Sequence, residues 1–368
     1  MKKPIFILLA SILMISGTTL YGQNKKGNEN YEVVISGDFD SMRNFSDGLA
    51  FASLFHAEEP SFMEFGFVDK TGKFVVHTYT EATGSFSEGL APVWDYETYK
   101  WGYFDKSGHW AIPPIFDDAS MFSEGLAFVY LDGKEGFINK KGEMTIPATF
   151  NYVEPFSEGL AIVEIDGKYG YINKKGQIAI PATFNDAGSF SEGLAVVKID
   201  GKCGYIDKTG KFVIPAIYDD ASRFSNGWAV VGYADQESYE NRYKYIDKNA
   251  QVVLAPITLT ETANHSESID DLLFSEDLAM FYENGKWGYI NKKGKIVIPA
   301  TFDEVGPFSE GFARVHIGDW LDGKEGFINK KGKFVVPAIF DWVENVTEGL
   351  AMVRFEDGTG GYIRIKKK

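Results

Sequence analysis

Cysteine and histidine are both scarce in this sequence of 368 residues. Cys203 is the single cysteine, so an intramolecular disulfide is excluded and no Cys-x-x-Cys pair can build a zinc site. None of the five histidines has a neighbour at the spacing with which two rings bind one zinc ion. They are His56, His77, His109, His265 and His316. We therefore expect neither a metal nor a cofactor.

Basic residues are also few beside the acidic ones: 37 Lys and Arg oppose 52 Asp and Glu, for a formal charge of −15. Nucleic-acid binding needs clustered Lys and Arg to neutralise phosphates, so we expect no nucleic-acid partner. Beyond the N-terminus, no apolar run approaches the length of a transmembrane helix, so we expect no membrane span. The remaining composition, 44% hydrophobic and 24% charged, is that of a folded chain.

Residues 1–22 have the pattern of a signal peptide. Lys2 and Lys3 precede an apolar run, Ile5–Ile15, that is too short to span a bilayer. We place cleavage before Gln23, and the mature chain then carries a charge near −17 because two lysines are removed. The alternative is a short buried helix. No cysteine follows the apolar run, which excludes a lipoprotein anchor, and we expect export to the periplasm or the extracellular space.

An internal repeat dominates the sequence. The string Phe-Ser-Glu-Gly-Leu-Ala recurs with small variations at spacings of 41, 36, 34, 34, 34, 50, 34 and 38 residues. Its copies start at Phe45, Phe86, Phe122, Phe156, Phe190, Phe224, Phe274, Phe308 and Val346. The commonest spacing is 34, and each longer one is that unit with an insertion. A fixed period of this length indicates a repeat protein of about nine units.

Each unit reads as short strands joined by tight turns. In one copy the strands are Gly193–Ile199, Cys203–Ile206 and Phe212–Tyr218. Asp200-Gly201 forms the first turn, since type I′ turns need positive φ and glycine adopts it at little cost. Asp207–Gly210 forms the second. Because no helical periodicity is sustained anywhere, we expect an all-β fold.

Comparison of the copies separates core from surface. The alanine of Gly-Leu-Ala is alanine in all nine copies, which predicts tight packing against the neighbouring unit. The phenylalanines that open the string predict a continuous core. The position before the glycine of the second strand varies instead, and we call it the variable position. Since glutamate is rarely buried unpaired, we expect this position to be partly exposed. Its members are Phe65, Trp101, Glu135, Tyr169, Cys203, Tyr243, Trp287 and Glu325.

These strings resemble the WG-repeat family of bacterial proteins. The resemblance rests on Trp-Gly-Tyr-Ile-Asn-Lys-Lys-Gly at 287–294, Ile-Pro-Ala-Thr-Phe-Asp at 298–303 and the Phe-Ser-Glu-Gly-Leu-Ala copies, and it covers roughly residues 40–366. Only Trp101 and Trp287 keep the family's tryptophan, and the unit at Tyr243-Lys244 lacks the glycine. The family implies interaction scaffolds, and it implies no catalytic residues to carry over.

The predicted architecture is a tandem array of nine units in an open, curved, solenoid-like arrangement. Proline recurs in the third strand, where it favours edges and bends. A closed, propeller-like toroid is the alternative, ranked second because propeller blades normally have four strands. We divide the chain into a signal peptide (1–22), an N-terminal segment (23–39), WG repeats 1–6 (40–254), a polar insertion (255–273) and WG repeats 7–9 (274–366).

Three insertions interrupt the period: Asp95–Tyr99, Ala234–Arg242 and Ala255–Leu273. Long loops on a rigid scaffold often carry function, although the last insertion could equally be a hinge between six units and three. No Gly-x-Ser-x-Gly elbow is present, and we interpret the recurring serines as turn residues that bond nearby backbone groups. Acidic pairs such as Asp117-Asp118 and Asp219-Asp220 are interpreted as turns, with calcium binding as the alternative.

The most favoured function is a secreted or periplasmic, non-enzymatic scaffold that binds a protein. The candidate interaction surface consists of six members of the variable position: Trp101, Tyr169, Tyr243, Trp287, Glu135 and Glu325. Binding of a glycan or an envelope polysaccharide is the alternative, because exposed aromatic rings can stack on sugars. A third hypothesis, a hydrolase with carboxylates on the insertions, has no residue pattern to support it.

Overall fold

The structure, a computed structural model, describes residues 27–55, 63–80, 83–234, 241–258, 269–319 and 321–366. The predicted signal peptide lies outside these residues. The described chain is almost entirely β, as expected, and its one 3₁₀ helix is η2 (Ile269–Leu272). Within the same residues, no helix is long and apolar enough to cross a membrane.

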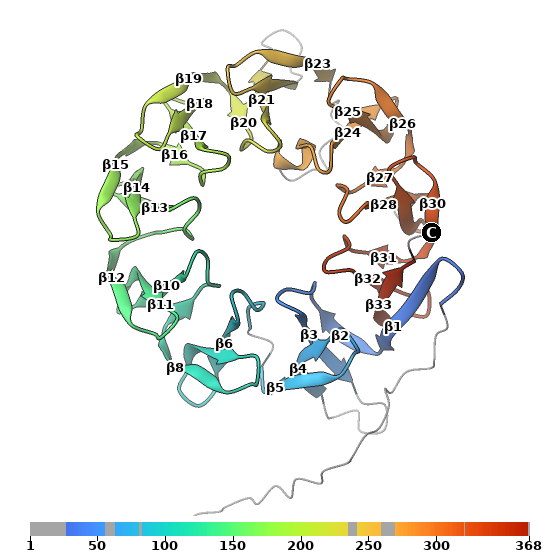
Figure 1. The fold of residues 1–368 in the computed structure, drawn as a ribbon, viewed down its shortest axis with the longest axis horizontal. Helices are drawn as coiled ribbons and strands as arrows, with labels where there is room; N and C mark the ends of the chain where they lie inside the picture. Colours follow the sequence, from blue (N-terminus) through green and yellow to red (C-terminus); the bar gives the residue numbers. More distant parts are fainter. Residues whose placement is uncertain are drawn as a thin grey trace, which may run out of the picture.

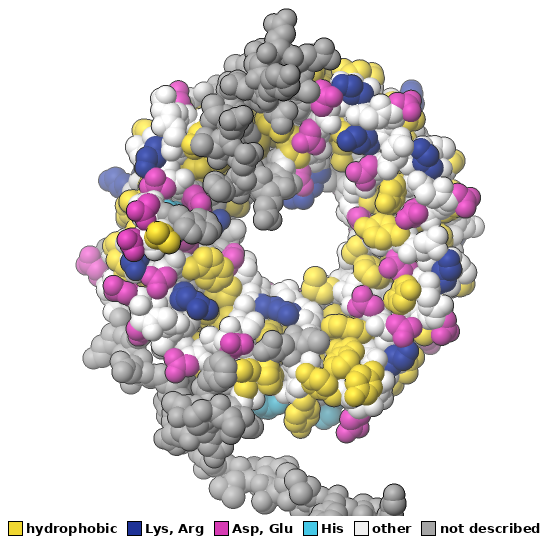
Figure 2. Space-filling view, turned by 180° about the vertical axis from the view of Figure 1, so that it is seen from behind, with side chains coloured by type: hydrophobic (Ala, Val, Ile, Leu, Met, Phe, Trp, Pro, Cys, Tyr) yellow, Lys and Arg dark blue, Asp and Glu magenta, His cyan; other side chains and the backbone are white. Residues whose placement is uncertain are grey.

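Nine small antiparallel sheets stand side by side in a closed ring, a nine-bladed β-propeller (Figure 1). The centre of the ring is open in the space-filling view (Figure 2). The expectation of an open, solenoid-like array is therefore wrong, and the alternative, a closed propeller-like toroid, agrees with the structure. Each blade is rotated relative to the one before it, and over nine repeats these rotations add up to a full turn. The sequence of a single repeat does not reveal the angle of this rotation.

Blade 5 illustrates the unit. From the centre outward it contains β16 (Asp186–Ala187), β17 (Leu194–Ile199), β18 (Lys202–Asp207) and β19 (Phe212–Tyr218), each antiparallel to its neighbour. The three longer strands agree with the predicted ones. The innermost strand is not predicted from the sequence, because two residues are too few to form a hydrophobic pattern. This fourth strand is what makes the unit a propeller blade.

The other blades follow the same plan, except that blade 7 has three strands among the described residues. The first long strands are β3 (Leu49–Phe55), β6 (Leu90–Asp95), β10 (Leu126–Leu131), β13 (Leu160–Ile165), β21 (Trp228–Ala234), β24 (Leu278–Glu283), β28 (Phe312–Ile317) and β32 (Ala351–Arg354). The second are β4 (Met63–Asp69), β7 (Lys100–Asp105), β11 (Lys134–Asn139), β14 (Lys168–Asn173), β22 (Asn241–Asp247), β25 (Lys286–Asn291), β29 (Lys324–Asn329) and β33 (Gly360–Ile365).

The outer and inner strands complete the sheets. The outer ones are β5 (Phe74–Thr78), β8 (Trp110–Phe116), β12 (Met144–Phe150), β15 (Ile178–Phe184), β23 (Val252–Thr258), β26 (Ile296–Phe302), β30 (Phe334–Phe340) and, in blade 9, β1 (Tyr31–Gly37). The inner ones are β2 (Phe39–Met42), β9 (Asp118–Ala119), β20 (Asp220–Ala221), β27 (Glu304–Val305) and β31 (Trp342–Val343). Isolated bridges, Thr83 to Val93 and Val153 to Val163, take their place in blades 2 and 4.

The ring is closed by the two ends of the described chain. Strand β1 pairs with β33 from Tyr31 opposite Ile365 to Gly37 opposite Gly360, so the N-terminal segment provides the outer strand of blade 9. Glu32 and Arg364 face each other in this pairing and form an ion pair of 2.8 Å. Part of the predicted N-terminal segment 23–39 is thus the closing strand of the propeller.

The glycine of the Trp-Gly pair is required by the bend in the outer strand. In blade 5, β18 and β19 pair Tyr205 with Ile214 and Cys203 with Tyr218, so β19 bulges opposite Gly204. A Cβ on Gly204 would lie 2.6 Å from a backbone nitrogen of β19, closer than real Cβ contacts allow. The same shift occurs in the five other blades that keep both the glycine and the third-strand proline.

Blades adhere through a repeated aromatic contact. In blade 4 the ring of Tyr171 packs edge-on against Phe190 of blade 5 at 5.0 Å, and its hydroxyl donates to the Gly188 carbonyl at 2.8 Å. Tyr362 of blade 9 makes the same two contacts with Phe45 and Arg43 of blade 1, which closes the cycle. The burial of the phenylalanines and of the nine alanines is confirmed, whereas the prediction of one continuous core is wrong. The core is divided into clusters between successive blades.

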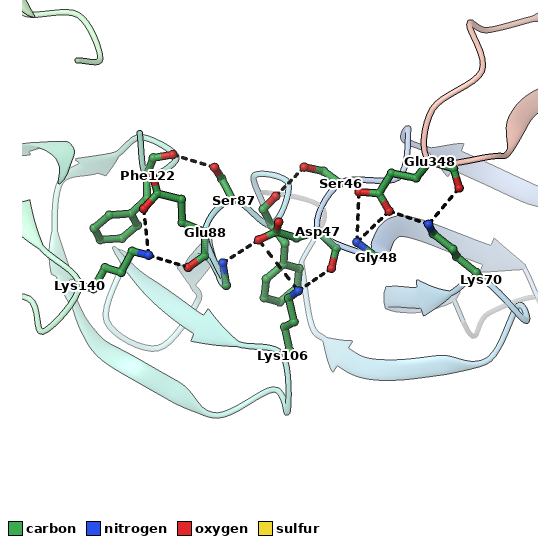
Figure 3. A network of polar contacts seen from close by, with 12 residues as sticks. Ser46, Asp47, Gly48, Lys70, Ser87, Glu88, Lys106, Phe122, Lys140 and Glu348 are labelled. Atoms are coloured by element: carbon green, nitrogen blue, oxygen red, sulfur yellow. Dashed lines mark hydrogen bonds and ion pairs between the residues drawn. The ribbon is translucent and has the colours of Figure 1, made fainter. Parts of the chain in front are cut away.

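The serine turns form a second, polar cycle (Figure 3). The Ser87 hydroxyl donates to the Phe122 carbonyl of the next blade at 2.7 Å, and the Glu88 carboxylate accepts from the Gly125 N–H at 3.1 Å. Lys140 donates to the Glu88 carbonyl and pairs with its carboxylate at 2.9 Å. The serines therefore bond the adjacent blade, whereas the sequence predicted a bond within the turn.

The polar cycle also joins the last blade to the first, but it is altered at two places. In blade 9, Thr347 replaces the serine, and its hydroxyl is buried without a hydrogen-bond partner among the described residues. Glu348 of blade 9 accepts from the Gly48 N–H at 3.0 Å, as Figure 3 shows. Between blades 6 and 7, Asn226 replaces the acidic residue and donates to the Phe274 carbonyl. The serine of that turn, Ser225, lies 3.5 Å from the same carbonyl, which is longer than in the other blades.

Both ends of the predicted insertion 255–273 belong to blades. Strand β23 continues to Thr258, and η2 leads into Leu272 and Leu273, which are buried. The Tyr245 hydroxyl donates to the Leu272 carbonyl at 2.6 Å, as other tyrosines do between other blades. Residues 259–268 lie outside the described residues.

Candidate interaction surface

The six predicted surface residues occupy the same place in six different blades. They lie near the start of β7, β11, β14, β22, β25 and β29, one residue before the glycine or, in blade 6, before Lys244. The propeller therefore distributes them around the ring and does not gather them into one site. Any shared role would have to be repeated from blade to blade.

The four aromatic members are half-buried at the seams between blades. Trp101 and Tyr169 each pack against the core that joins their own blade to the next. Trp287 contacts the clusters on both sides of blade 7, and Tyr243 contacts the core between blades 6 and 7. Partial exposure, as predicted, is confirmed for these four residues, and much of each ring serves packing.

The two glutamates bond backbone groups. Glu135 accepts from the Val153 N–H at 2.5 Å, and Glu325 accepts from the Val343 N–H at 2.6 Å, in each case from the following blade. Burial raises the pKa of both carboxyls above the usual value. They connect blades and are not free acidic groups on a surface.

Glu325 is only 5% exposed, so the expectation that the variable position is partly exposed is wrong there. Its carboxylate lies 3.5 Å from the Arg314 guanidinium and 3.7 Å from the His316 ring, which stabilise it inside the blade. Cys203, at the same position in blade 5, is buried as well. Side chains on the adjacent strand therefore determine whether the residue at the variable position is exposed to solvent.

Irregular connections gather at one end of the blades. Longer hairpins than the two-residue Asp-Gly and Asn-Gly turns of blades 3, 4, 5 and 7 join β3–β4, β6–β7, β21–β22, β28–β29 and β32–β33. The link from β23 to η2 starts from the same end. We call this end of the ring the hairpin face. The opposite end carries the serine turns and is nearly uniform.

The most exposed aromatic group of the hairpin face lies in blade 2. The hairpin between β6 and β7 has the sequence Trp94-Asp-Tyr-Glu-Thr-Tyr-Lys-Trp101, with Tyr96 53% and Tyr99 72% exposed. Tyr79, at the end of β5 in blade 1, is 89% exposed. Figure 2 shows hydrophobic side chains gathered over blades 2 and 3. The repeat spacing predicts the insertion Asp95–Tyr99 but not this cluster, although four aromatic residues within eight are a signal for it in the sequence.

The acidic pairs that suggested calcium are turn residues. Asp219 forms an ion pair with Lys202 at 2.5 Å, and Asp220 accepts from the Ala221 N–H at 2.9 Å. In the part of the chain that the structure describes, no three His, Cys, Asp or Glu side chains come together as metal ligands would. The described histidines have polar partners: His77 lies 3.1 Å from Glu64, and His109 2.7 Å from the Ser107 hydroxyl. His56 and His265 lie outside the described residues.

A shallow cavity of about 550 Å³ lies at the closing seam of the ring. It is lined by Tyr31 of β1, Ile339 and Phe340 of β30, and Phe355, Glu356 and Asp357 of blade 9. The lining is mostly side chains that pack β1 against its neighbours. The cavity belongs to the closure and shows no convergent catalytic groups.

Comparison with protein families gives one assignment. The family described as "WG containing repeat" matches residues 28–54, 65–93, 101–134, 136–169, 169–203, 204–233, 287–319 and 326–358. A search of curated proteins finds no match.

Three solved structures are similar to this chain at low sequence identity. A crystal structure of a eukaryotic initiation factor is 12% identical, with a TM-score of 0.50 over 71% of this chain and 77% of the other. The Dos1 propeller is 12% identical, with a TM-score of 0.36 over 91% and 94%. PorZ, a surface component of the type-IX secretion system of Porphyromonas gingivalis, is 11% identical, with a TM-score of 0.31 over 92% and 52%.

Proposed function

Because the chain belongs to the family of proteins built from WG-containing repeats, we propose that it is an exported, non-enzymatic scaffold that binds a protein partner. The observation that carries this proposal is the asymmetry of the ring. Five lengthened hairpins and the link between blades 6 and 7 all leave from the hairpin face, while the serine face is nearly uniform. Insertions that vary on one face of a regular scaffold are typical of a recognition surface.

The chemistry of the hairpin face supports protein recognition. Tyrosine and tryptophan are enriched among the residues that dominate protein interfaces, since each buries a large rigid ring and keeps a polar group. Tyr79, Tyr96 and Tyr99 provide such rings on adjacent blades. The serine face instead uses its charged side chains for contacts between blades, as Lys140 does with Glu88.

Affinity capture tests the binding proposal. Mature protein, residues 23–368, is immobilised beside a variant in which Tyr96–Tyr99 is replaced by Asp-Gly, the turn of blade 3, and a variant with residues 259–268 shortened. The control is Lys141→Ser in a serine-face turn, where the lysine is exposed. We expect a specific protein that the wild type and the control retain and at least one hairpin-face variant loses.

Two results would contradict this proposal. A polysaccharide retained in place of a protein would favour the glycan alternative, and equal retention of the partner by all variants would place its site elsewhere. Export is tested separately by sequencing the N-terminus of the protein recovered outside the cytoplasm. We expect it to begin at Gln23, and recovery of the uncleaved chain from the cytoplasm alone would refute export.

A further inference from the structure

The hairpin of blade 2 places two tyrosine rings against the indole of Trp94. The ring of Tyr96 lies 4.8 Å from Trp94 at an interplanar angle of 80°, and that of Tyr99 lies 5.7 Å from Trp94 at 78°. Trp101 is directly opposite Trp94 in the strand pairing, so both indoles lie on the same side of the sheet. Two phenol rings thus stand nearly perpendicular to an indole that the neighbouring strand supports.

The backbone holds this arrangement in place. The Asp95 carboxylate accepts from the Thr98 N–H at 3.0 Å and from the Thr98 hydroxyl at 2.6 Å. The Tyr99 N–H donates to the Asp95 carbonyl at 2.9 Å. Tyr99 itself has φ of 57°, a left-handed conformation that glycine adopts at lower cost. These bonds hold the backbone of the hairpin that carries the two tyrosines.

The charge of the hairpin is negative and uncompensated. Asp95 and Glu97 lie in the same five-residue segment as the rings, and no described lysine or arginine forms an ion pair with either. Lys100, the basic residue nearest in sequence, is paired with Asp117. On the neighbouring blade, the exposed Asp118 also has no basic partner among the described residues. The aromatic faces and the carboxylates together favour a cation.

We infer that Trp94, Tyr96 and Tyr99 form an aromatic cage that takes a lysine or arginine side chain from a basic segment of a protein partner. Perpendicular aromatic rings bind ammonium and guanidinium groups through their negative faces, and nearby carboxylates add attraction. The net charge of −15 complements a basic partner and steers it toward the ring. This inference rests on the proposed scaffold function and names the chemistry of the partner.

Isothermal titration of the mature protein with hexa-arginine in 20 mM salt tests the cage. The first test variant is Tyr99→Gly, because glycine adopts the left-handed φ at lower cost, so the ring is removed without destabilising the hairpin. The second test variant is Tyr96→Ala. The control is Trp342→Ala, which removes a ring that is 38% exposed in blade 9. We expect hexa-arginine to bind the wild type and the control within twofold of each other. Each cage variant should bind at least tenfold more weakly, and hexa-glutamate should not bind.

Equal affinity of the wild type and both cage variants for hexa-arginine would overturn the cage, since binding would then reflect net charge alone. No binding by the wild type would overturn it as well. Failure of the scaffold function has a different signature. If the cage variants lose hexa-arginine but no protein is captured from extracts, the cage stands and the scaffold proposal fails. If a captured protein is retained equally by both cage variants, the scaffold stands and the cage fails.

Discussion

At the scale of single residues, the repeats are constrained by contacts with the next strand or the next blade. Gly170 has no room for a side chain, because the bulge of β15 passes directly over it. Phe190 is constrained by an edge-on contact with the ring of Tyr171 in the preceding blade. The members of the variable position, in contrast, meet different neighbours in each blade. Such contacts explain which positions of the repeat tolerate change.

The bulge predicts a difference between two glycines of blade 4. A Cβ at position 170 would lie 2.6 Å from the Ala182 nitrogen, whereas Gly167 has no atom within 4 Å of its Cβ direction but has φ of 73°. We expect Gly170→Ala to lower the free energy of unfolding by roughly 2–3 kcal/mol through overpacking. Gly167→Ala should lower it by about 1 kcal/mol through strain. Urea unfolding measures both, and equal losses would show that the bulge yields to the methyl group.

The buried carboxylate of Glu325 predicts a dependence of stability on pH. Burial raises its pKa above the ordinary 4.5, so the folded state favours the protonated form. Its contribution is therefore fully present below the unfolded-state pKa and declines as pH rises through the folded-state pKa. Relative to Glu325→Gln, which stays neutral, the wild type should lose stability as pH increases from 4 toward 7.

Thermal unfolding between pH 4 and 8 measures this difference. Glu283→Gln, at an exposed position of β24, is the matched control, and its difference from the wild type should vary less with pH. A difference between the wild type and Glu325→Gln that is constant over this range would contradict the raised pKa.

At the scale of elements, the serine turn is the part of the unit that joins blades by hydrogen bonds. Glu88 and Gly89 have φ of 52° and 90°, which are the two left-handed residues of a type I′ turn. This geometry presents the serine hydroxyl and the acidic side chain to the following blade. The Phe-Ser-Glu-Gly-Leu-Ala string therefore recurs within this chain for two reasons. It forms the turn, and its side chains make hydrogen bonds to the following blade.

Two serines at the same place in successive turns give a matched test. The Ser191 hydroxyl donates to the Phe224 carbonyl at 2.7 Å. The Ser225 hydroxyl instead lies 3.5 Å from the Phe274 carbonyl, and the Asn226 side-chain amide donates to that same carbonyl at 2.8 Å. We expect Ser191→Ala to cost about 1 kcal/mol of unfolding free energy and Ser225→Ala to cost much less. Chemical denaturation decides this, and a larger loss for Ser225→Ala would contradict the assignment of the bonds.

At the scale of the whole molecule, stability depends on closing the ring. The outer strand of blade 9 comes from the N-terminal end of the chain, so the ring is complete only when β1 has paired with β33. Without β1 the last sheet would expose an unpaired edge, which is a site for pairing with another chain. In a propeller of nine similar units, this one pairing is the contact with the largest separation in sequence.

A cross-link across the closure tests its contribution. Glu32 and Arg364 are exposed and directly opposite, so Glu32→Cys with Arg364→Cys, in a Cys203→Ala background, places two thiols across the seam. The disulfide would close a loop of most of the chain and should stabilise the fold by up to about 5 kcal/mol. Melting of the oxidised and the reduced protein measures the gain. Identical melting temperatures would show that the closure does not open in the unfolding transition.

The sequence by itself determined the number of repeats, the three long strands of each unit, the turns between them and the phenylalanine and alanine core. These follow from local periodicity, turn chemistry and comparison of the nine copies. Only the tertiary structure decided that the array is closed, that a two-residue inner strand completes blades 3, 5, 6, 8 and 9, and that Ser87 bonds the next blade. It also decided that Glu325 is buried and that the rings of Tyr96 and Tyr99 stand nearly perpendicular to that of Trp94. These features depend on the angle between successive units and on contacts between different copies, and the spacing of residues along one chain carries neither.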